Sequence, residues 1–358
     1  MKKRFSRRWL IALLVLLLLA LAIPLAGVLA QAGQSSTCPP DCMVSFQTPS
    51  MFNPASFEAG RIDALFKFIL VIAAIIFVLV EGALFFAVWR FRNRPAESAM
   101  QVHGNTKLEI AWTAAPAVIL AVLLGFTFQT MGEVKAVTSE NVMPVQAIGH
   151  QWWWEFRYPD LQMVTANEMI VPVNTVVEVS VQSVDVEHGF WAPELFGKVD
   201  AVPGYTNRLR FTPTEVRNDY FGGLCTQFCG VEHTQMRFAV VVRTAEQFQD
   251  WVALMQPAAA PAESLSPEAA AGREVLLASQ CIGCHTIGGT AAAGQVGPNL
   301  THLQSRGFIA GGVLQNTPDN LRAWITDPQA IKPGSQMPSL GLSAEQVNSL
   351  VAYLTTLR

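Results

Sequence analysis

Three long apolar stretches dominate the first 131 residues of the chain. The first runs from Trp9 to Leu29, directly after five basic residues, and two more run from about Leu65 to Trp89 and from about Ile110 to Met131. Each of the last two is long enough to cross a hydrocarbon core of roughly 30 Å as a helix. The pattern therefore predicts a membrane hairpin, over residues 64–132.

The first apolar stretch has the features of an export signal, because basic residues precede it and small residues follow it. Cleavage after Ala30 or Ala32 would remove it, so we predict a signal peptide over residues 1–30 and an external segment over residues 31–63. An uncleaved helix is the alternative. The hairpin loop holds Arg90, Arg92, Arg94 and Lys107. Since basic loops stay in the cytoplasm, everything after the hairpin is expected on the outer face in either case.

From about Asn141 to Val252 the pattern changes to short apolar alternations bounded by proline and glycine. Alternating apolar residues share one face of a strand, so this pattern predicts a sandwich or barrel of β-strands. The residues that alternate are Val177, Val179 and Val181, then Leu209 and Phe211, then Phe238, Val240 and Val242. We assign residues 137–254 to this domain.

Residues 255–266 are rich in proline and alanine and lack periodicity, which predicts a semi-extended linker. The last segment, residues 267–358, has helical spacing. Ser266 before Pro267 predicts a helix start, and Ser343 with Gln346 predicts a capping box. The chain is therefore expected to end in a helical domain.

Composition supports a membrane protein, since only 14% of the residues are charged against roughly 25% in an average soluble domain. The net charge of −3 gives no electrostatic footprint of a nucleic-acid binder. The six cysteines form three close pairs, Cys38/Cys42, Cys225/Cys229 and Cys281/Cys284. Close pairs favour local metal or cofactor chemistry, although for Cys38 and Cys42 a disulfide or free thiols are expected.

The third cysteine pair lies in Cys281-Ile-Gly-Cys284-His285, the pattern that attaches a c-type haem through both thiols and binds its iron through the histidine. A redox pair or half a zinc site is the alternative, but the chain is exported and no further cysteine pair follows. Met337 is the only methionine after this motif, and methionine opposite histidine suits electron transfer. His302 as the sixth ligand, or Met337 as core packing, remain the alternatives.

We expect the stretch Gly297-Pro298-Asn299-Leu300 to orient His285, because a backbone carbonyl there can accept a hydrogen bond from the imidazole. Residues 267–358 as a whole resemble a class I cytochrome c, because the Cys-x-x-Cys-His, Gly-Pro-x-Leu and Met-Pro elements occur in that order. The resemblance implies an all-α domain with one covalent haem c.

The second cysteine pair belongs to a denser motif: Cys225, Cys229, His233 and Met236 fall within twelve residues. Soft sulfur ligands with imidazole select copper, and a weak thioether marks electron-transfer copper. Two cysteines four residues apart can bridge a pair of metals, which would need a second histidine, and His188 is the candidate. A Cys225–Cys229 disulfide, favoured in an oxidising compartment, and a core histidine at 188 are the alternatives.

This motif resembles the binuclear copper (CuA) site of cytochrome c oxidase subunit II. The resemblance implies a cupredoxin fold in which His188 and Met236 complete one copper and His233 binds the other. It also implies that Cys225 and Cys229 bridge both coppers and that the Gln227 backbone carbonyl is the remaining ligand. Many family members have glutamate at Gln227, whose side chain binds magnesium or manganese. The change puts that metal in doubt, although Asp200 still matches a family position.

The resemblance extends to Thr106–Pro116 in the hairpin and to Gly149–Glu155. It implies that Trp152 is the electron entry and that Glu109 lies at the mouth of a proton channel. A membrane-interface tryptophan and a solvated helix start are the alternatives. Glu81 lies inside the first spanning helix, where a carboxylate usually faces protein or a proton path.

The predicted fold class is a multi-domain membrane protein with a transmembrane hairpin, an all-β cupredoxin-like sandwich and an all-α cytochrome c domain. The resemblance implies subunit II of a caa-type haem-copper oxidase in a bacterial plasma membrane. Its expected partners are subunit I and other subunits, a redox protein that donates electrons, and the lipid bilayer. Oxygen reduction and proton pumping would belong to the complex. A membrane-anchored electron carrier without an oxidase partner is the alternative, and the hairpin motif argues against it.

Overall fold

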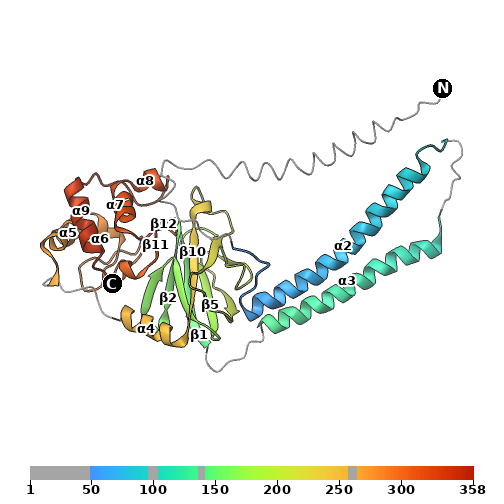
Figure 1. The fold of residues 1–358 in the computed structure, drawn as a ribbon, viewed down its shortest axis with the longest axis horizontal. Coiled ribbons are helices and arrows are strands. Elements are labelled where there is room, and N and C mark those ends of the chain that lie inside the picture. The colour runs from blue at the N-terminus through green and yellow to red at the C-terminus, as the bar shows by residue number, and fades with distance from the viewer. Residues whose placement is uncertain (1–48, 96–103, 136–141, 257–263) are drawn as a thin grey trace. The chain divides into compact units, whose positions relative to one another are not determined.

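The computed structural model describes residues 49–95, 104–135, 142–256 and 264–358 (Figure 1). Two long helices, α2 (Phe57–Phe91) and α3 (Thr106–Lys135), run side by side. Both are long and apolar enough to cross a membrane, and no residue in their most apolar windows is buried. The predicted hairpin helices are therefore confirmed. The predicted signal peptide, Cys38 and Cys42 lie outside the described residues.

The start of α2 is built into the β-domain. Ser56 caps the helix by accepting a hydrogen bond from the Ala59 amide, and its hydroxyl donates to the Leu195 carbonyl. The Glu58 carboxylate accepts from the amide and the hydroxyl of Thr212 at 2.7 and 3.1 Å. Ala55, Ser56 and Glu58 are all buried. The membrane helix therefore emerges directly from the packed β-domain.

Ten strands form two five-stranded sheets, ordered β3-β2-β1-β5-β8 and β4-β10-β9-β6-β7. Most neighbours are antiparallel, but β1 pairs with β5, and β4 with β10, in parallel. The strands are β1 (Val142–His150), β2 (Trp153–Tyr158), β3 (Met163–Ala166), β4 (Glu168–Pro172), β5 (Val176–Ser183), β6 (His188–Trp191), β7 (Val199–Ala201), β8 (Asn207–Phe211), β9 (Phe221–Cys225) and β10 (Arg237–Arg243). The predicted sandwich is confirmed.

The alternating valines of β5 and the apolar residues of β10 point into the core, as their spacing predicted. Aromatic rings fill the centre: Phe190 stacks on Phe238 with centroids 4.4 Å apart, and Trp154 meets both edge-on. Gly223 is required beside them, because a Cβ there would lie 2.2 Å from the Phe238 ring. This core fixes the strand ends from which the copper-type ligands project.

One part of the β-domain differs from the predicted strands. Residues Ala245–Met255 form helix α4, which begins with a capping box between Thr244 and Gln247. Phe248 and Met255 are buried in it, and Trp251 packs against the Tyr158 ring. Their helical spacing explains why this segment leaves the strand pattern.

The C-terminal domain is helical, with α5 (Pro267–Ala278), α6 (Cys281–Cys284), α7 (Pro318–Thr326), α8 (Pro328–Ile331) and α9 (Ala344–Leu354), and a short hairpin of β11 (Phe308–Ile309) and β12 (Leu314–Gln315). The predicted capping box of Ser343 and Gln346 is confirmed. Helices α5 and α9 pack closely, because Gly272 leaves no side chain where a Cβ would meet the Ser349 carbonyl at 1.8 Å.

Candidate metal centres

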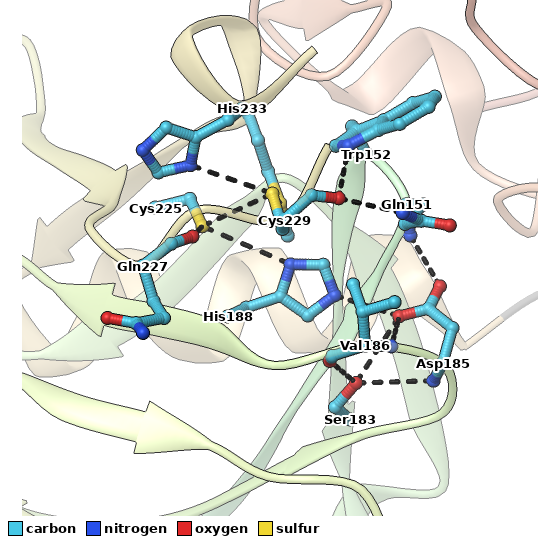
Figure 2. A network of polar contacts seen from close by, with 11 residues as sticks. Gln151, Trp152, Ser183, Asp185, Val186, His188, Cys225, Gln227, Cys229 and His233 are labelled. Carbon is cyan, nitrogen blue, oxygen red and sulfur yellow. Dashed lines mark hydrogen bonds and ion pairs between the residues drawn. The ribbon is translucent and has the colours of Figure 1, made fainter. Parts of the chain in front are cut away.

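A cluster of sulfur and imidazole atoms lies where three strands begin or end. Cys225 ends β9, His188 begins β6, and Cys229, His233 and Met236 lie in the connection from β9 to β10. The Cys225 and Cys229 sulfurs are 3.7 Å apart, and Figure 2 shows both imidazoles directed toward them. His188 Nδ1 lies 3.9 Å from Cys225 Sγ, and His233 Nδ1 lies 3.6 Å from Cys229 Sγ. The fold therefore gathers these residues from two segments of the chain.

The remaining expected ligands are also at this cluster. Met236 Sδ lies 3.8 Å from Cys229 Sγ, and the Gln227 carbonyl oxygen lies 3.2 Å from Cys225 Sγ. A disulfide needs sulfurs about 2.05 Å apart, so the two thiols are free. His188, Cys225, Cys229 and Met236 are buried. Two thiolates, two imidazoles, one thioether and one carbonyl in this arrangement fit a pair of soft metal ions.

The protonation of the two thiols is asymmetric. The side-chain hydrogen bond with Cys229 lowers the pKa of Cys225, and the hydrogen bond with His188 lowers it further. The same contact with Cys225 raises the pKa of Cys229. Soft metals bind cysteine as the thiolate, so loading the site with metal would release protons from this pair.

Asp185 fixes the orientation of His188. Its Oδ1 lies 2.8 Å from His188 Nε2, on the side of the ring that faces away from the sulfurs. Burial would lower the pKa of His188, but hydrogen bonds with Asp185 and Cys225 outweigh burial and raise it. A proton held on Nε2 leaves Nδ1 free to bind metal.

Asp185 also holds the loop that carries Trp152. Its Oδ2 accepts a hydrogen bond from the Gln151 amide at 2.7 Å. The Gln151 side chain and the Trp152 indole both donate to the Cys229 carbonyl, at 2.7 and 3.0 Å (Figure 2). Trp152, which the sequence singled out as an electron entry, therefore contacts the backbone of a cysteine in the cluster. Neither Asp185 nor Gln151 was predicted from the sequence as a site residue, and the one available signal was the spacing of Asp185 three residues before His188.

The haem-type residues surround a largely apolar cavity in the helical domain. Cys281 and Cys284 are the two ends of α6, and His285 follows directly. His285 Nδ1 donates to the Pro298 carbonyl at 2.8 Å, which confirms the expected role of the Gly-Pro-Asn-Leu stretch. Burial lowers the pKa of His285, so its ring is held neutral, as an iron ligand requires.

Met337 lines this cavity together with Cys281, Cys284 and His285. Its backbone carbonyl accepts a hydrogen bond from the Gln329 side chain at 2.8 Å. His302, the alternative iron ligand, is buried and its Nδ1 donates to the Arg358 carbonyl at 2.8 Å. Two thiols, a neutral imidazole and a thioether around an apolar cavity fit a covalent haem, with Met337 favoured over His302.

Other residues singled out from the sequence lie apart from these clusters. Glu109 is exposed in the first turn of α3 and accepts a hydrogen bond from the Asn105 amide at 3.2 Å. Glu81 is exposed on α2. Lys198 lies between Asp200 and the Gln227 side chain, 3.0 Å from Asp200 Oδ1 and 3.5 Å from Gln227 Oε1. The roles of Glu109 and Glu81 in proton transfer, and of Asp200 in a second metal site, stay predictions.

Three family models cover most of the chain in the order that the fold shows. The model described as cytochrome c oxidase subunit II, transmembrane domain, matches residues 45–130, and the one described as its periplasmic domain matches residues 161–244. The cytochrome c model matches residues 269–358. The chain is thus a membrane-anchored electron-transfer protein with a C-terminal cytochrome c domain, and these domain families imply copper and haem c.

Relatives of known name match most of this chain. Cytochrome c oxidase subunit 2 of Alkalihalophilus pseudofirmus is 34% identical over 299 residues, covering 81% of this chain and 85% of that protein. Cytochrome c oxidase subunit 2 of Bacillus sp. (strain PS3) is 34% identical over 287 residues, covering 75% and 80%. The chain belongs to the cytochrome c oxidase subunit 2 family.

Among solved structures, the periplasmic domain of subunit II of cytochrome oxidase of Bradyrhizobium japonicum is similar at 31% identity. The match covers 33% of this chain and 96% of that domain, with a TM-score of 0.32.

Family membership makes the chain a subunit of a cytochrome c oxidase, which implies a complex with subunit I. It also places the two domains that follow the hairpin outside the membrane.

Proposed function

We propose that this subunit receives electrons at a covalent haem c and passes them through a binuclear CuA centre to subunit I of a proton-pumping oxidase. The distance of 3.7 Å between two buried, unbonded cysteine sulfurs carries the proposal, since each thiolate can then bridge two metals. In this assignment His188 and Met236 would hold one copper, and His233 and the Gln227 carbonyl would hold the other.

On the haem side, Cys281 and Cys284 would hold the porphyrin, and His285 and Met337 would bind the iron. When bound, the copper pair and the haem supply one-electron redox chemistry. The protein holds the ligands in place: Asp185 keeps the proton on Nε2 of His188, and Pro298 keeps the proton on Nδ1 of His285. Trp152 would bring electrons to the copper pair, because its indole donates to the Cys229 carbonyl.

The test is the copper-to-haem ratio and the electron paramagnetic resonance spectrum of the full-length chain in detergent. We expect two coppers per haem and one unpaired electron shared over both coppers. Cys229→Ser should abolish the shared signal and leave the haem absorbance unchanged. Gln227→Ala is the matched control, since the ligand there is a backbone carbonyl, and it should keep both coppers. A single copper in the unmodified chain would disprove the binuclear assignment.

Purification from native membranes tests the proposed transfer to subunit I. The chain should co-purify with subunit I, a further haem and a third copper. Purification of the chain by itself would contradict the proposal.

A further inference from the structure

A buried lysine joins the haem domain to the copper domain. Lys332 follows α8 in the haem domain, and only 3% of its surface is exposed. Its ammonium donates to the Trp152 carbonyl at 2.9 Å and to the Gln235 carbonyl at 3.2 Å, both in the copper domain. A third hydrogen bond runs to the Ala310 carbonyl of its own domain at 3.3 Å.

These contacts match the chemistry of an ammonium group. An ammonium has three N–H donors, and a buried charge is tolerated where its hydrogen bonds are satisfied. Here three carbonyls receive three donors, and two of the three belong to the other domain. One of those carbonyls is that of Trp152. Loss of the ammonium would therefore leave buried carbonyls of the copper domain without their donor.

Glu168 makes a second connection between the two domains, this time from a side chain of the copper domain to the haem domain. It is the first residue of β4, and only 6% of its surface is exposed. It accepts a hydrogen bond from the Phe308 amide of the haem domain at 2.8 Å. Burial raises the pKa of the Glu168 carboxyl to about 7, while the Phe308 hydrogen bond and the buried Arg306 guanidinium, both from the haem domain, oppose this rise. The ionised form that these two contacts favour is the stronger hydrogen-bond acceptor.

The turn between β11 and β12 fits closely against the copper domain. The Arg237 amide donates to the Gly311 carbonyl at 3.2 Å. Gly311 has a φ of +74°, and a Cβ at this position would lie 2.5 Å from Lys332 Nζ and 2.8 Å from the Trp152 carbonyl oxygen. Only glycine permits both this conformation and this approach.

The haem-type cavity extends to the contact between the haem domain and the copper domain. Its lining includes Cys281, His285 and Met337 of the haem domain, together with Trp152 and Trp153 of the copper domain. We call the set of Lys332, Phe308 and Gly311 with Trp152, Gln235 and Glu168 the interdomain seam. It holds the cavity against the indole that contacts the copper-type cluster.

We propose that the interdomain seam docks the chain's own haem domain over Trp152, with Lys332 and Glu168 as the positioning residues. The partner at the Trp152 face is then this tethered domain. Each transfer would move one electron, oxidising the haem iron and reducing the copper pair, with no bond formed or broken. This inference rests on the proposed function for its electron path but not for its geometry.

The test compares the full-length chain, carrying haem and copper, with Lys332→Met and Glu168→Ala. Hydrogen exchange at the Phe308 and Arg237 amides reports seam opening without any metal signal. We expect exchange there to rise by about tenfold or more in both variants. Transfer from flash-reduced haem to copper should slow in parallel, while the optical and paramagnetic spectra stay unchanged. Two variants are used so that misfolding of one leaves the other decisive.

Arg322→Met is the matched control, because Arg322 is a partly exposed cation of the haem domain that bonds Asn348 and Asp319 away from the seam. It should change neither measurement. Unchanged exchange at both amides in both seam variants would overturn the docking proposal. Absence of the shared copper signal from the unmodified chain would instead defeat the proposed function, and the exchange result would still decide the seam.

Discussion

The copper-type and haem-type sites are organised in opposite ways. In the copper domain, neighbouring protein groups already hold two of the ligand residues: Asp185 holds His188, and the Cys229 carbonyl receives two hydrogen bonds. In the haem domain, His285 is fixed by Pro298, but the space beside it is an apolar cavity. Small ions can occupy a site that hydrogen bonds have assembled beforehand. A large cofactor has to serve as part of the core itself.

Removing each cofactor in turn tests this contrast and has the largest expected effect. Without haem, in Cys281→Ala/Cys284→Ala, an empty apolar cavity remains, and cavities cost about 24 cal/mol per Å³. Exchange at the Gly297 and Leu300 amides, which bond the Cys284 and Thr286 carbonyls, should accelerate by about 100-fold or more.

Copper removal by a chelator is the counterpart of that experiment. The Cys225 and Thr226 amides bond the Met236 and Gly189 carbonyls at 3.0 and 2.9 Å. Their exchange should change by less than about threefold, because the protein supplies these contacts without metal. Equal losses of protection in the two domains would contradict the contrast.

Gly297→Ala tests how strictly the haem side depends on the support of His285. A Cβ at residue 297 would lie 2.5 Å from His285 Cε1 and 2.8 Å from its Nδ1. The ring would have to move away from the Pro298 carbonyl, at a cost of about 1–3 kcal/mol of stability. Thermal unfolding followed by haem absorbance measures this. Gly283→Ala in the Cys281–His285 motif is the control, since a Cβ there meets nothing within 4 Å. A similar loss of stability in both variants would refute this dependence.

Asp185→Asn tests the preassembled copper side and has the smallest expected effect. Asparagine keeps an acceptor for His188 but removes the charge that favours the proton on Nε2. Loss of such support typically lowers metal affinity by about 10–100-fold, which competition with a chelator can measure. Glu187→Gln removes an equal charge from an exposed neighbour and should leave affinity unchanged. The same affinity in both variants would mean that Asp185 does not support the ligand.

The sequence was most informative where ligands lie close together in the chain. Cys225, Cys229, His233 and Met236 fall in one connection, so their spacing alone indicated a metal site. The contacts of Lys332 with Trp152 span 180 positions and depend on how two domains pack, which no local pattern records. Helix α4 was missed because its widely spaced apolar residues were taken together with the strand alternation that precedes them.

The capping of α2 by the β-domain has a mechanical consequence. Ser56 and Glu58 bond Leu195 and Thr212, so the membrane helix and the sandwich share one rigid joint instead of a swivel. Tilting of the β-domain over the lipid would have to break these buried bonds. In the proposed electron path, this joint would hold the height of the sulfur cluster above the bilayer constant, and with it the gap to the membrane-embedded acceptor. Precise placement of a site is best achieved on rigid elements.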